Sequence, residues 1–335
     1  MKIDFTFAVL VYNHSDYIVE HLESIKYQIN TYGQGLNVKL VLSDDGSKDN
    51  SVELIESWIK YNDGLFCDVC IIGDGTNRGV GHSYTSMWEH IGSESFKLLA
   101  GDDIYSFENV FQMSEYLEDN EFVTGLPLLL VDGEIIQSKA LIMNIYATQH
   151  IYEKASFLSK IKNINVINTP SLIYQNKFIQ SQETLEFIRK FRVTEDFPMM
   201  AHLASTYQKI KFLTLGKVYV YYRRTSGSIY LVANDKYNQD KDDVFKYLES
   251  IDESAIGRFM LRNRRFCYGL SGVKSKFLNL NYYVYLFRFL CALPKTLRSM
   301  HSTNISVDKH ETHYQLISVN AKEFKSRMLE STSGV

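Results

Sequence analysis

Short apolar runs alternate with helical patterns along the first 125 residues. The apolar runs, which predict buried strands, are residues 5–12, 38–43, 67–73 and 96–100. Between them, apolar residues recur at helical spacing within 18–25, 50–60 and 81–91. This alternation predicts βαβ units, and therefore a parallel sheet covered by helices on both faces.

The pattern becomes mixed after this region. Strands are predicted near 122–131, 164–174 and 217–223, and helices near 176–191 and 196–206. From about residue 235 the chain is helical, first polar and then basic and aromatic, and the polar stretch 301–335 predicts a poorly ordered end. We therefore expect an α/β protein with a mixed, mostly parallel sheet flanked by helices and a C-terminal helical extension.

Each predicted strand of the first region ends in a polar loop. These loops read YNHSD (12–16), SDDGSKDN (43–50), GDGTNRGVG (73–81) and GDDIYS (101–106). Ligands of parallel sheets bind beyond the carboxyl ends of the strands, so the four loops are expected to line one site.

Three of the loops carry side chains suited to a nucleotide or a metal ion. Asp44 or Asp45 is suited to accept hydrogen bonds from a ribose hydroxyl or a pyrimidine base, although the same stretch also fits a turn with a helix cap. Arg78 is placed to reach a diphosphate or a base. The adjacent Asp102 and Asp103 suit Mg²⁺, which commonly takes one or two carboxylates plus substrate phosphates; a solvated surface turn is the alternative.

The composition is that of a globular protein with a substantial core. The chain has 335 residues, of which 45% are hydrophobic and 22% charged. Its net charge of −3 argues against a nucleic-acid-binding protein. Four cysteines favour reduced thiols and a cytoplasmic setting. Cys67 and Cys70 are expected to be buried structural thiols, because no second Cys/His pair lies near them to complete a zinc site.

The order of the motifs resembles that of the inverting glycosyltransferases of family 2, which have the Rossmann-like GT-A fold and are common in bacterial surface polysaccharide biosynthesis. The resemblance covers about residues 5–230. It is carried by VLVYNHSDYIVEHLESI (9–25), LVLSDDGSKDNS (40–51), NRGVGHSYTSMWEH (77–90), LLAGDDIY (98–105), NTPSLIYQ (168–175), TEDFPMMAHL (194–203) and VYYRRTSGSI (220–229).

The resemblance implies that the first two loops bind the nucleotide. Val11, Tyr12 and Asn13 would line the nucleotide pocket. Asp45 would meet the base, and Asp44 would support the turn.

The other two loops would complete the donor site. Asn77 and Arg78 would contact the nucleotide. Asp102 and Asp103 resemble the family's acidic motif, which binds the donor together with Mn²⁺ or Mg²⁺, with Asp103 as the direct metal ligand.

The resemblance also assigns the reacting groups. Asp196, with Glu195 beside it, matches the catalytic-base motif. Arg223 and Arg224 fall where the family has a Tyr-Arg pair that closes over the diphosphate. The family often has a histidine after that pair, where this chain has Thr225, so neither a metal nor a diphosphate contact is implied for the loop that follows.

The implied activity is metal-dependent transfer of a sugar, a hexosyl or N-acetylhexosaminyl group, from a nucleotide-sugar to a hydroxyl of a growing glycan. The nucleotide-sugar would be UDP-linked, and the acceptor a lipid-linked bacterial oligosaccharide of an O-antigen, capsule or exopolysaccharide. Three parts are expected: a nucleotide-sugar-binding subdomain (1–125), an acceptor-binding and catalytic-base subdomain (126–230) and a C-terminal helical extension (231–335).

The C-terminal extension has a charge pattern of its own. Residues 262–300 contain eight Lys/Arg and no Asp or Glu, which leaves −3 − 8 = −11 for the rest of the chain. Eight aromatic residues lie among these basic residues. Such a segment lies on an anionic membrane surface, here the cytoplasmic face of the inner membrane, or packs its aromatic rings on the catalytic domain or on a second subunit, and the two arrangements can coexist. Its most apolar stretch, 277–293, is 17 residues long and carries Arg288, so it is not expected to span a membrane.

Two other functions remain open at this point. A sugar nucleotidyltransferase also uses a Rossmann-like sheet, but it usually has a glycine-rich basic loop where this chain has YNHSDY (12–17). A non-catalytic, membrane-associated scaffold with a degenerate transferase fold would not need the acidic pairs. The sequence leaves a monomer and a homo-oligomer equally open.

Overall fold

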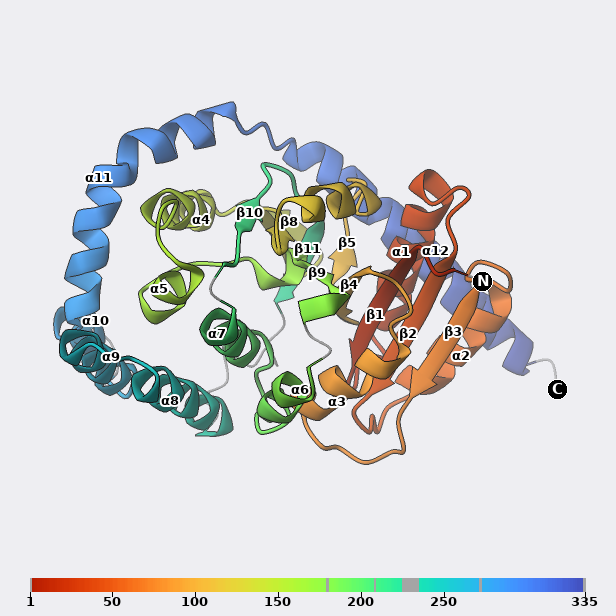
Figure 1. Ribbon diagram of the computed structural model, residues 1–335. Coiled ribbons are helices and arrows are strands. Elements are labelled where there is room, and N and C mark those ends of the chain that lie inside the picture. The colour runs from red at the N-terminus through yellow and green to blue at the C-terminus, as the bar shows by residue number, and fades with distance from the viewer. Residues whose placement is uncertain (1, 179–180, 208, 225–234, 271–272, 334–335) are drawn as a thin grey trace.

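The computed structural model describes residues 2–178, 181–207, 209–224, 235–270 and 273–333 (Figure 1). The strands are β1 (Phe5–Val11), β2 (Val38–Asp44), β3 (Asp68–Ile72), β4 (Ser95–Ala100), β5 (Ile104–Tyr105), β6 (Phe122–Thr124), β7 (Pro127–Val131), β8 (Glu134–Ile136), β9 (Ile173–Gln175), β10 (Phe212–Thr214) and β11 (Val220–Arg224). The α-helices are α1 (Ile18–Tyr32), α2 (Ser51–Tyr61), α3 (Val80–Ser86), α4 (Lys139–Ile151), α5 (Phe157–Lys162), α6 (Gln182–Ile188), α7 (Asp196–Thr206), α8 (Asp235–Ser250), α9 (Ala255–Tyr268), α10 (Val273–Phe277), α11 (Leu280–Ser302) and α12 (Val307–Ser333). Short 3₁₀ helices are η1 (Trp88–His90), η2 (Phe111–Glu118), η3 (Thr169–Ser171) and η4 (Asn176–Phe178).

A seven-stranded sheet forms the centre of the molecule, in the order β10-β6-β9-β4-β1-β2-β3. The four strands predicted from the first region, β1 to β4, are all parallel to their neighbours in this set. β9 is antiparallel to both β4 and β6. A second sheet has the order β5-β11-β7-β8. The expected α/β fold, with a mostly parallel sheet flanked by helices and a C-terminal helical region, is confirmed.

Alternation along β1 divides the core into two layers. Phe7 and Val9 belong to the layer that includes α1, α2 and α12, whereas Ala8 and Leu10 belong to the layer that includes α3, α6 and α7. All four side chains are buried because both faces of the sheet are covered by helices (Figure 1).

The middle of the chain differs from the sequence prediction. Residues 122–131 form two strands in different sheets, and the chain turns between them at Gly125, where a Cβ would lie 2.5 Å from the Tyr219 ring. Within the stretch 164–174 only the last two residues belong to a strand, and Pro170 lies in η3 instead. Proline lacks the N–H that a sheet requires, which explains the late start of β9.

The C-terminal end corrects a second expectation. The polar stretch 301–335 was expected to be poorly ordered, but most of it forms α12, which packs along α1 (Figure 1). Tyr314, Ile317, Ala321 and Phe324 are buried. Their spacing of three and four residues makes one apolar stripe, which a high overall polarity hides.

The two neighbouring cysteines are also not buried as expected. Cys67 is exposed and Cys70 is half-buried. Both lie at β3, which is an edge strand of the sheet and therefore has one side open.

Candidate active site

The ends of β1, β2 and β4 meet at one edge of the sheet. The Asp45 N–H donates to the Val11 carbonyl over 2.9 Å, and the Gly101 N–H donates to the Leu10 carbonyl over 2.8 Å. β1 is therefore flanked by the Asp44–Asp45 loop on one side and by the Asp102–Asp103 loop on the other, as the parallel order requires.

The first two loops are joined through Asn13. Its N–H donates to Ser47 Oγ over 2.9 Å, and its side-chain oxygen accepts from the Lys48 N–H over 2.7 Å. Asn13 has a positive φ of 54°, a conformation that asparagine tolerates better than most residues. The neighbouring Tyr12 is 45% exposed, whereas Val11 is buried. Tyr12 and Asn13, and not the Val11 side chain, therefore face the solvent side of this loop.

Asp44 closes the turn of the second loop. Its carboxylate accepts hydrogen bonds from the Gly46 and Ser47 N–H groups, both over 3.1 Å. Gly46 has a φ of +75°, and a Cβ there would lie 2.7 Å from the Asn77 backbone nitrogen. Glycine thus lets the second loop approach the third, which brings the Asn77 backbone against Gly46.

Asp45 holds the third loop onto β2. Its buried carboxylate accepts from the Arg78 N–H over 2.8 Å, from the Gly79 N–H over 3.0 Å and from Ser83 Oγ over 3.1 Å. The Arg78 side chain is exposed and forms a two-pronged pair with Asp74, over 2.8 and 2.6 Å, which lowers the pKa of Asp74 to about 2. Asp45 thus has a structural task that the sequence did not reveal, in addition to any contact with a base.

The acidic pair after β4 consists of one buried and one half-buried carboxylate. Asp103 is 2% exposed, and its Oδ1 accepts from the Arg223 N–H over 2.7 Å. Burial, and then the charge of Asp102, raise the pKa of Asp103 well above its usual value, whereas Arg223 and Lys97 act in the opposite direction. A divalent cation would relieve this repulsion, so the pair fits a metal ion chemically.

The Arg223 side chain is held by contacts within the protein. Its guanidinium forms an ion pair with Glu20 of α1, donates from Nε to the Asp102 carbonyl over 2.6 Å and lies 4.6 Å from the centre of the Tyr17 ring. The side chain therefore fixes the acidic loop to α1. The next residue, Arg224, is exposed at the same strand end. Thr225 lies outside the described residues.

Asp196 begins α7 and is oriented by two hydrogen bonds. Its Oδ2 accepts from Thr169 Oγ1 over 2.9 Å, and its Oδ1 accepts from the Phe197 N–H over 2.6 Å. Burial, followed by the charge of Asp196, raises the pKa of Glu195 to about 8.

Tyr222 connects the two acidic groups. Burial is the main cause that raises the pKa of its hydroxyl, and the charges of Asp103, Asp102 and Asp196 raise it further. Contacts place both groups beside β11: Asp103 accepts from the Arg223 N–H of that strand, and Thr169, which donates to Asp196, lies in η3, which packs on β11.

The loop before Glu195 packs directly on the third loop. The Val80 N–H donates to the Arg192 carbonyl over 3.0 Å, and a Cβ at Gly81 would lie 2.3 Å from the Phe191 carbonyl oxygen. The nucleotide loop implied by the resemblance and the segment that leads to Asp196 are thus in backbone contact.

Three residues that the sequence did not single out support these groups. Asp240 of α8 accepts from the N–H groups of residues 192–194 over 2.8–3.2 Å, and so anchors the segment before Glu195. Lys97, fully buried on β4, donates to the Pro170 carbonyl beside Thr169. Glu20 pairs with Arg223. Each partner lies tens of positions away in the sequence, so no local pattern could have indicated it.

Among the described residues, no three or more His, Cys, Asp or Glu side chains gather into a ready-made metal site. Two carboxylates alone suit Mg²⁺ or Mn²⁺ when the substrate supplies phosphate oxygens. The site therefore has an exposed polar edge formed by the first three loops, an acidic pair fit for a cation, and a separate carboxylate held at a helix start.

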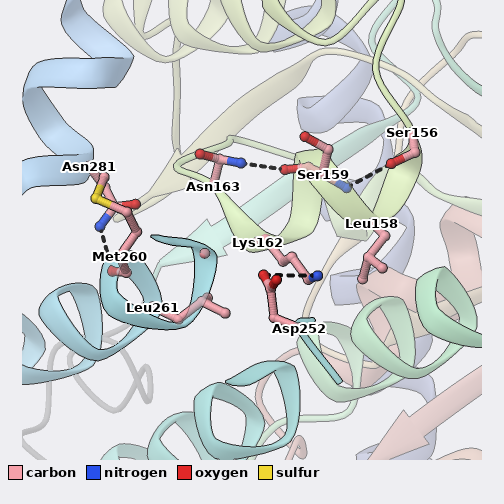
Figure 2. A pocket seen from close by; sticks show the side chains of 10 residues that line it. Ser156, Leu158, Ser159, Lys162, Asn163, Asp252, Met260, Leu261 and Asn281 are labelled. Atoms are coloured by element: carbon pink, nitrogen blue, oxygen red, sulfur yellow. Dashed lines mark hydrogen bonds and ion pairs between the residues drawn. The ribbon is translucent and has the colours of Figure 1, made fainter. Parts of the chain in front are cut away.

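A cavity of about 300 Å³ lies elsewhere, between α5 and the helices α9 and α11 (Figure 2). Lys162 and Asp252 both line it and form a 3.0 Å ion pair with each other. Asn163 and Asn281 donate to the carbonyls of Ser159 and Met260. None of the predicted site residues lines it; the Lys162–Asp252 ion pair joins α5 to the segment before α9, and the Asn281 contact joins α11 to α9.

The family of the chain follows from comparison with known proteins. Residues 6–177, about half of the chain, match the model of glycosyl transferase family 2. The chain therefore belongs to this family and is a glycosyltransferase, which sets aside the nucleotidyltransferase. No curated protein sequence is significantly similar to it.

Solved structures share the fold. A structure of TarS from S. aureus has 14% sequence identity and a TM-score of 0.55 over 95% of this chain, which spans 54% of that TarS chain. TarS 1–349 in complex with UDP-GlcNAc has 16% identity and a TM-score of 0.54, over 93% of this chain and 91% of that one. The mannosyltransferase PcManGT from Pyrobaculum calidifontis, in complex with GDP-Man and Mn²⁺, has 12% identity and a TM-score of 0.55, over 96% of this chain and 87% of that one. This likeness shows that the fold is GT-A.

Proposed function

We propose that this glycosyltransferase moves a sugar from a UDP-sugar to a hydroxyl group of a growing bacterial surface glycan, with inversion at the anomeric carbon and with help from Mn²⁺ or Mg²⁺. The observation that carries the proposal is the meeting of four strand-end loops beside a carboxylate at the start of α7. A solved complex of the similar TarS with UDP-GlcNAc supports the choice of donor, and that of PcManGT with Mn²⁺ supports the metal.

The nucleotide would lie over the first three loops. Tyr12 and Asn13 offer an exposed ring and an exposed backbone, Asp45 and Asn77 offer polar groups, and Arg78 offers a cation that Asp74 already orients. Asp45 accepts three hydrogen bonds from protein groups, so any base contact would use its remaining acceptor capacity.

The diphosphate would lie at the acidic pair. Asp102 and Asp103 would hold the cation, which neutralises the negative charge that develops on the leaving diphosphate. Arg224, at the exposed end of β11, would provide a second positive charge. Arg223 would serve this step indirectly, because it holds the Asp102 carbonyl and the Asp103 carboxylate in position.

Asp196 would act as the catalytic base. It would take the proton from the acceptor hydroxyl while that oxygen attacks the anomeric carbon on the side opposite the diphosphate. The C1–O bond to the diphosphate breaks as the new glycosidic bond forms, so no covalent enzyme intermediate is needed. The hydrogen bonds from Thr169 to Oδ2 and from the Phe197 N–H to Oδ1 would orient the carboxylate, and each oxygen keeps a further lone pair that can accept the proton of the acceptor hydroxyl.

The test is a comparison of transfer and donor binding in two variants. Asp196→Asn is expected to lower kcat by about 10²–10⁴-fold, the usual worth of a general base, and to leave UDP-sugar affinity unchanged. Asp119→Asn, an exposed carboxylate after η2, is the matched control and should keep wild-type turnover. Undiminished transfer by Asp196→Asn would remove the base assignment, and a screen of UDP-sugars without any turnover would remove the donor class.

A further inference from the structure

The outer surface of α9, α10 and α11 exposes large apolar side chains. We name this surface the outer apolar face and define it by Ile256, Phe259, Phe266, Val273, Phe277, Tyr283, Phe287, Leu290 and Leu297. Val273 is 82% exposed, and Phe277 and Phe287 are each 70% exposed. Soluble proteins rarely gather so many large apolar side chains on one surface without a binding partner.

Helix α11 turns its apolar side outward. Tyr283, Phe287, Leu290 and Leu297 follow one another at intervals of three, four and seven residues, so they share one side of the helix, and all are exposed. The opposite side, with Ala292 and its buried neighbours, packs on α4. An ordinary surface helix has the reverse arrangement, with its polar side outward.

The three helices form one continuous surface at the rim of the molecule (Figure 1). The Asn263 side chain of α9 donates to the Leu278 carbonyl and accepts from the Leu280 N–H, which joins the middle of α9 to the start of α11. The Tyr283 hydroxyl donates to the Phe277 carbonyl.

The inner side of these helices is fastened to the body by polar contacts. Arg264 donates to the carbonyls of Lys162 and Asn163 at the end of α5, over 3.0 and 2.9 Å. The ion pair of Lys162 with Asp252 lies beside them (Figure 2). The outer apolar face is thus presented on helices that already have their inner contacts.

Charge identifies the occupant. Residues 254–307 contain nine Lys/Arg and no Asp or Glu. Arg264 is buried against α5, and Arg262, Arg265 and Lys295 form ion pairs with acids of neighbouring elements. Lys274, Lys276 and Arg298 are exposed around the outer apolar face. A second copy that docked symmetrically through this face would bring its basic residues against the same basic residues. An anionic lipid surface instead complements both the charge and the apolar side chains.

We propose that the outer apolar face docks the protein on an anionic lipid bilayer, with the aromatic and aliphatic side chains inserted at the interface and the lysines and arginines at the lipid phosphates. In the part of the chain that the structure describes, no helix has the length and apolar character needed to cross a membrane, so the helices would lie along the surface. This inference does not depend on the proposed sugar transfer.

The test is vesicle co-sedimentation of the full chain, with vesicles of phosphatidylcholine alone and of phosphatidylcholine mixed with phosphatidylglycerol. The wild type is expected to bind the anionic vesicles at least about tenfold more tightly and to be released by salt. Phe287→Glu combined with Leu290→Glu should lower the binding by about tenfold or more, because two inserted side chains become charged.

A second variant tests the charge contribution. Lys274→Glu combined with Lys276→Glu is expected to reduce binding to anionic vesicles by about tenfold or more and to leave the weak binding to neutral vesicles unchanged. Leu36→Glu combined with Lys60→Glu is the matched control, since these residues are exposed on the part of the molecule that contains α1 and α2. Circular dichroism checks that each variant is folded.

Three outcomes would overturn the inference. They are absence of wild-type binding to anionic vesicles, an equal loss in the control variant, and dissociation of an oligomer by Phe287→Glu/Leu290→Glu with vesicle binding intact. The last outcome would assign the face to self-association. Asp103→Asn should bind vesicles like the wild type whether or not it transfers sugar, so failure of the proposed function and failure of this inference are distinguishable.

Discussion

The ion pair between Glu20 and Arg223 is expected to hold the acidic loop in place. The Arg223 side chain is 8% exposed and that of Glu20 is 14% exposed. Two unit charges about 4 Å apart interact by about 4 kcal/mol at an effective dielectric constant of about 20, and contact with water reduces this value. Glu20→Gln should therefore lower the free energy of unfolding by about 2–3 kcal/mol, below the roughly 3–5 kcal/mol found for fully buried pairs.

A double-mutant cycle isolates this interaction from the other contacts of Arg223. Glu20→Gln, Arg223→Gln and the double variant would be unfolded in urea, and a coupling energy of about 1.5–3 kcal/mol is expected. The cycle for Glu153 and Lys295, an exposed pair at 2.7 Å, is the control and should give a much smaller coupling because water screens both charges. Equal coupling in the two cycles, or none for the first pair, would refute the reasoning.

The same variants separate two roles for Arg223. If this arginine holds the acidic loop, Glu20→Gln should weaken metal-dependent donor binding, since the loop loses its support. If Arg223 instead closes over the diphosphate, release from Glu20 should leave donor affinity unchanged or increase it. Isothermal titration with UDP and Mn²⁺ distinguishes the two results.

Three further changes test the surroundings of the site. Asp240→Ala should lower the free energy of unfolding by about 2 kcal/mol in denaturation experiments, and in steady-state kinetics it should lower kcat more than it raises KM. Asp243→Ala on the same helix is the control and should do neither. The pKa of Glu195 is raised from 4.5 to about 8, so between these pH values the folded protein holds a proton that the unfolded chain releases. The free energy of unfolding should therefore fall as pH rises from about 4.5 through 8. Glu195→Gln should flatten this dependence in melting experiments at a series of pH values, and an unchanged slope would contradict the raised pKa. Gly81→Ala should lower the melting temperature and the donor affinity, because the added Cβ would lie 2.3 Å from a backbone carbonyl oxygen. Gly216→Ala, whose Cβ would lie 3.3 Å from its nearest neighbour, should be nearly neutral, and equal effects of the two substitutions would refute the close packing at Gly81.

The sequence predicted the first half of the sheet because its signals are local. Apolar runs define β1 to β4, and polar loops follow each of them, so the parallel topology alone brings Asp45 and Asp103 to one edge. Helix α7 was also predicted with its observed bounds, 196–206, which places Asp196 in the first turn. These features needed no knowledge of distant contacts.

What the sequence did not indicate depends on partners far along the chain. The ion pair of Arg223 with Glu20 joins residues 203 positions apart, and the hydrogen bond from Thr194 to Asp240 spans 46 positions. α12 was missed because its buried stripe of four apolar residues is diluted by charged residues on the exposed side. The exposure of Cys67 depends on β3 being an edge strand, which the apolar run itself does not reveal.

The central claim is that the strand-end loops form one metal-dependent site for a nucleotide diphosphate. Its most direct test is calorimetric titration of UDP into the wild type and into Asp102→Asn and Asp103→Asn, each with and without Mn²⁺. We expect Mn²⁺ to strengthen UDP binding to the wild type and to have no such effect on either variant. The account would be contradicted if Mn²⁺ left the UDP affinity of the wild type unchanged. It would also be contradicted if Mn²⁺ strengthened UDP binding to both folded variants as much as to the wild type.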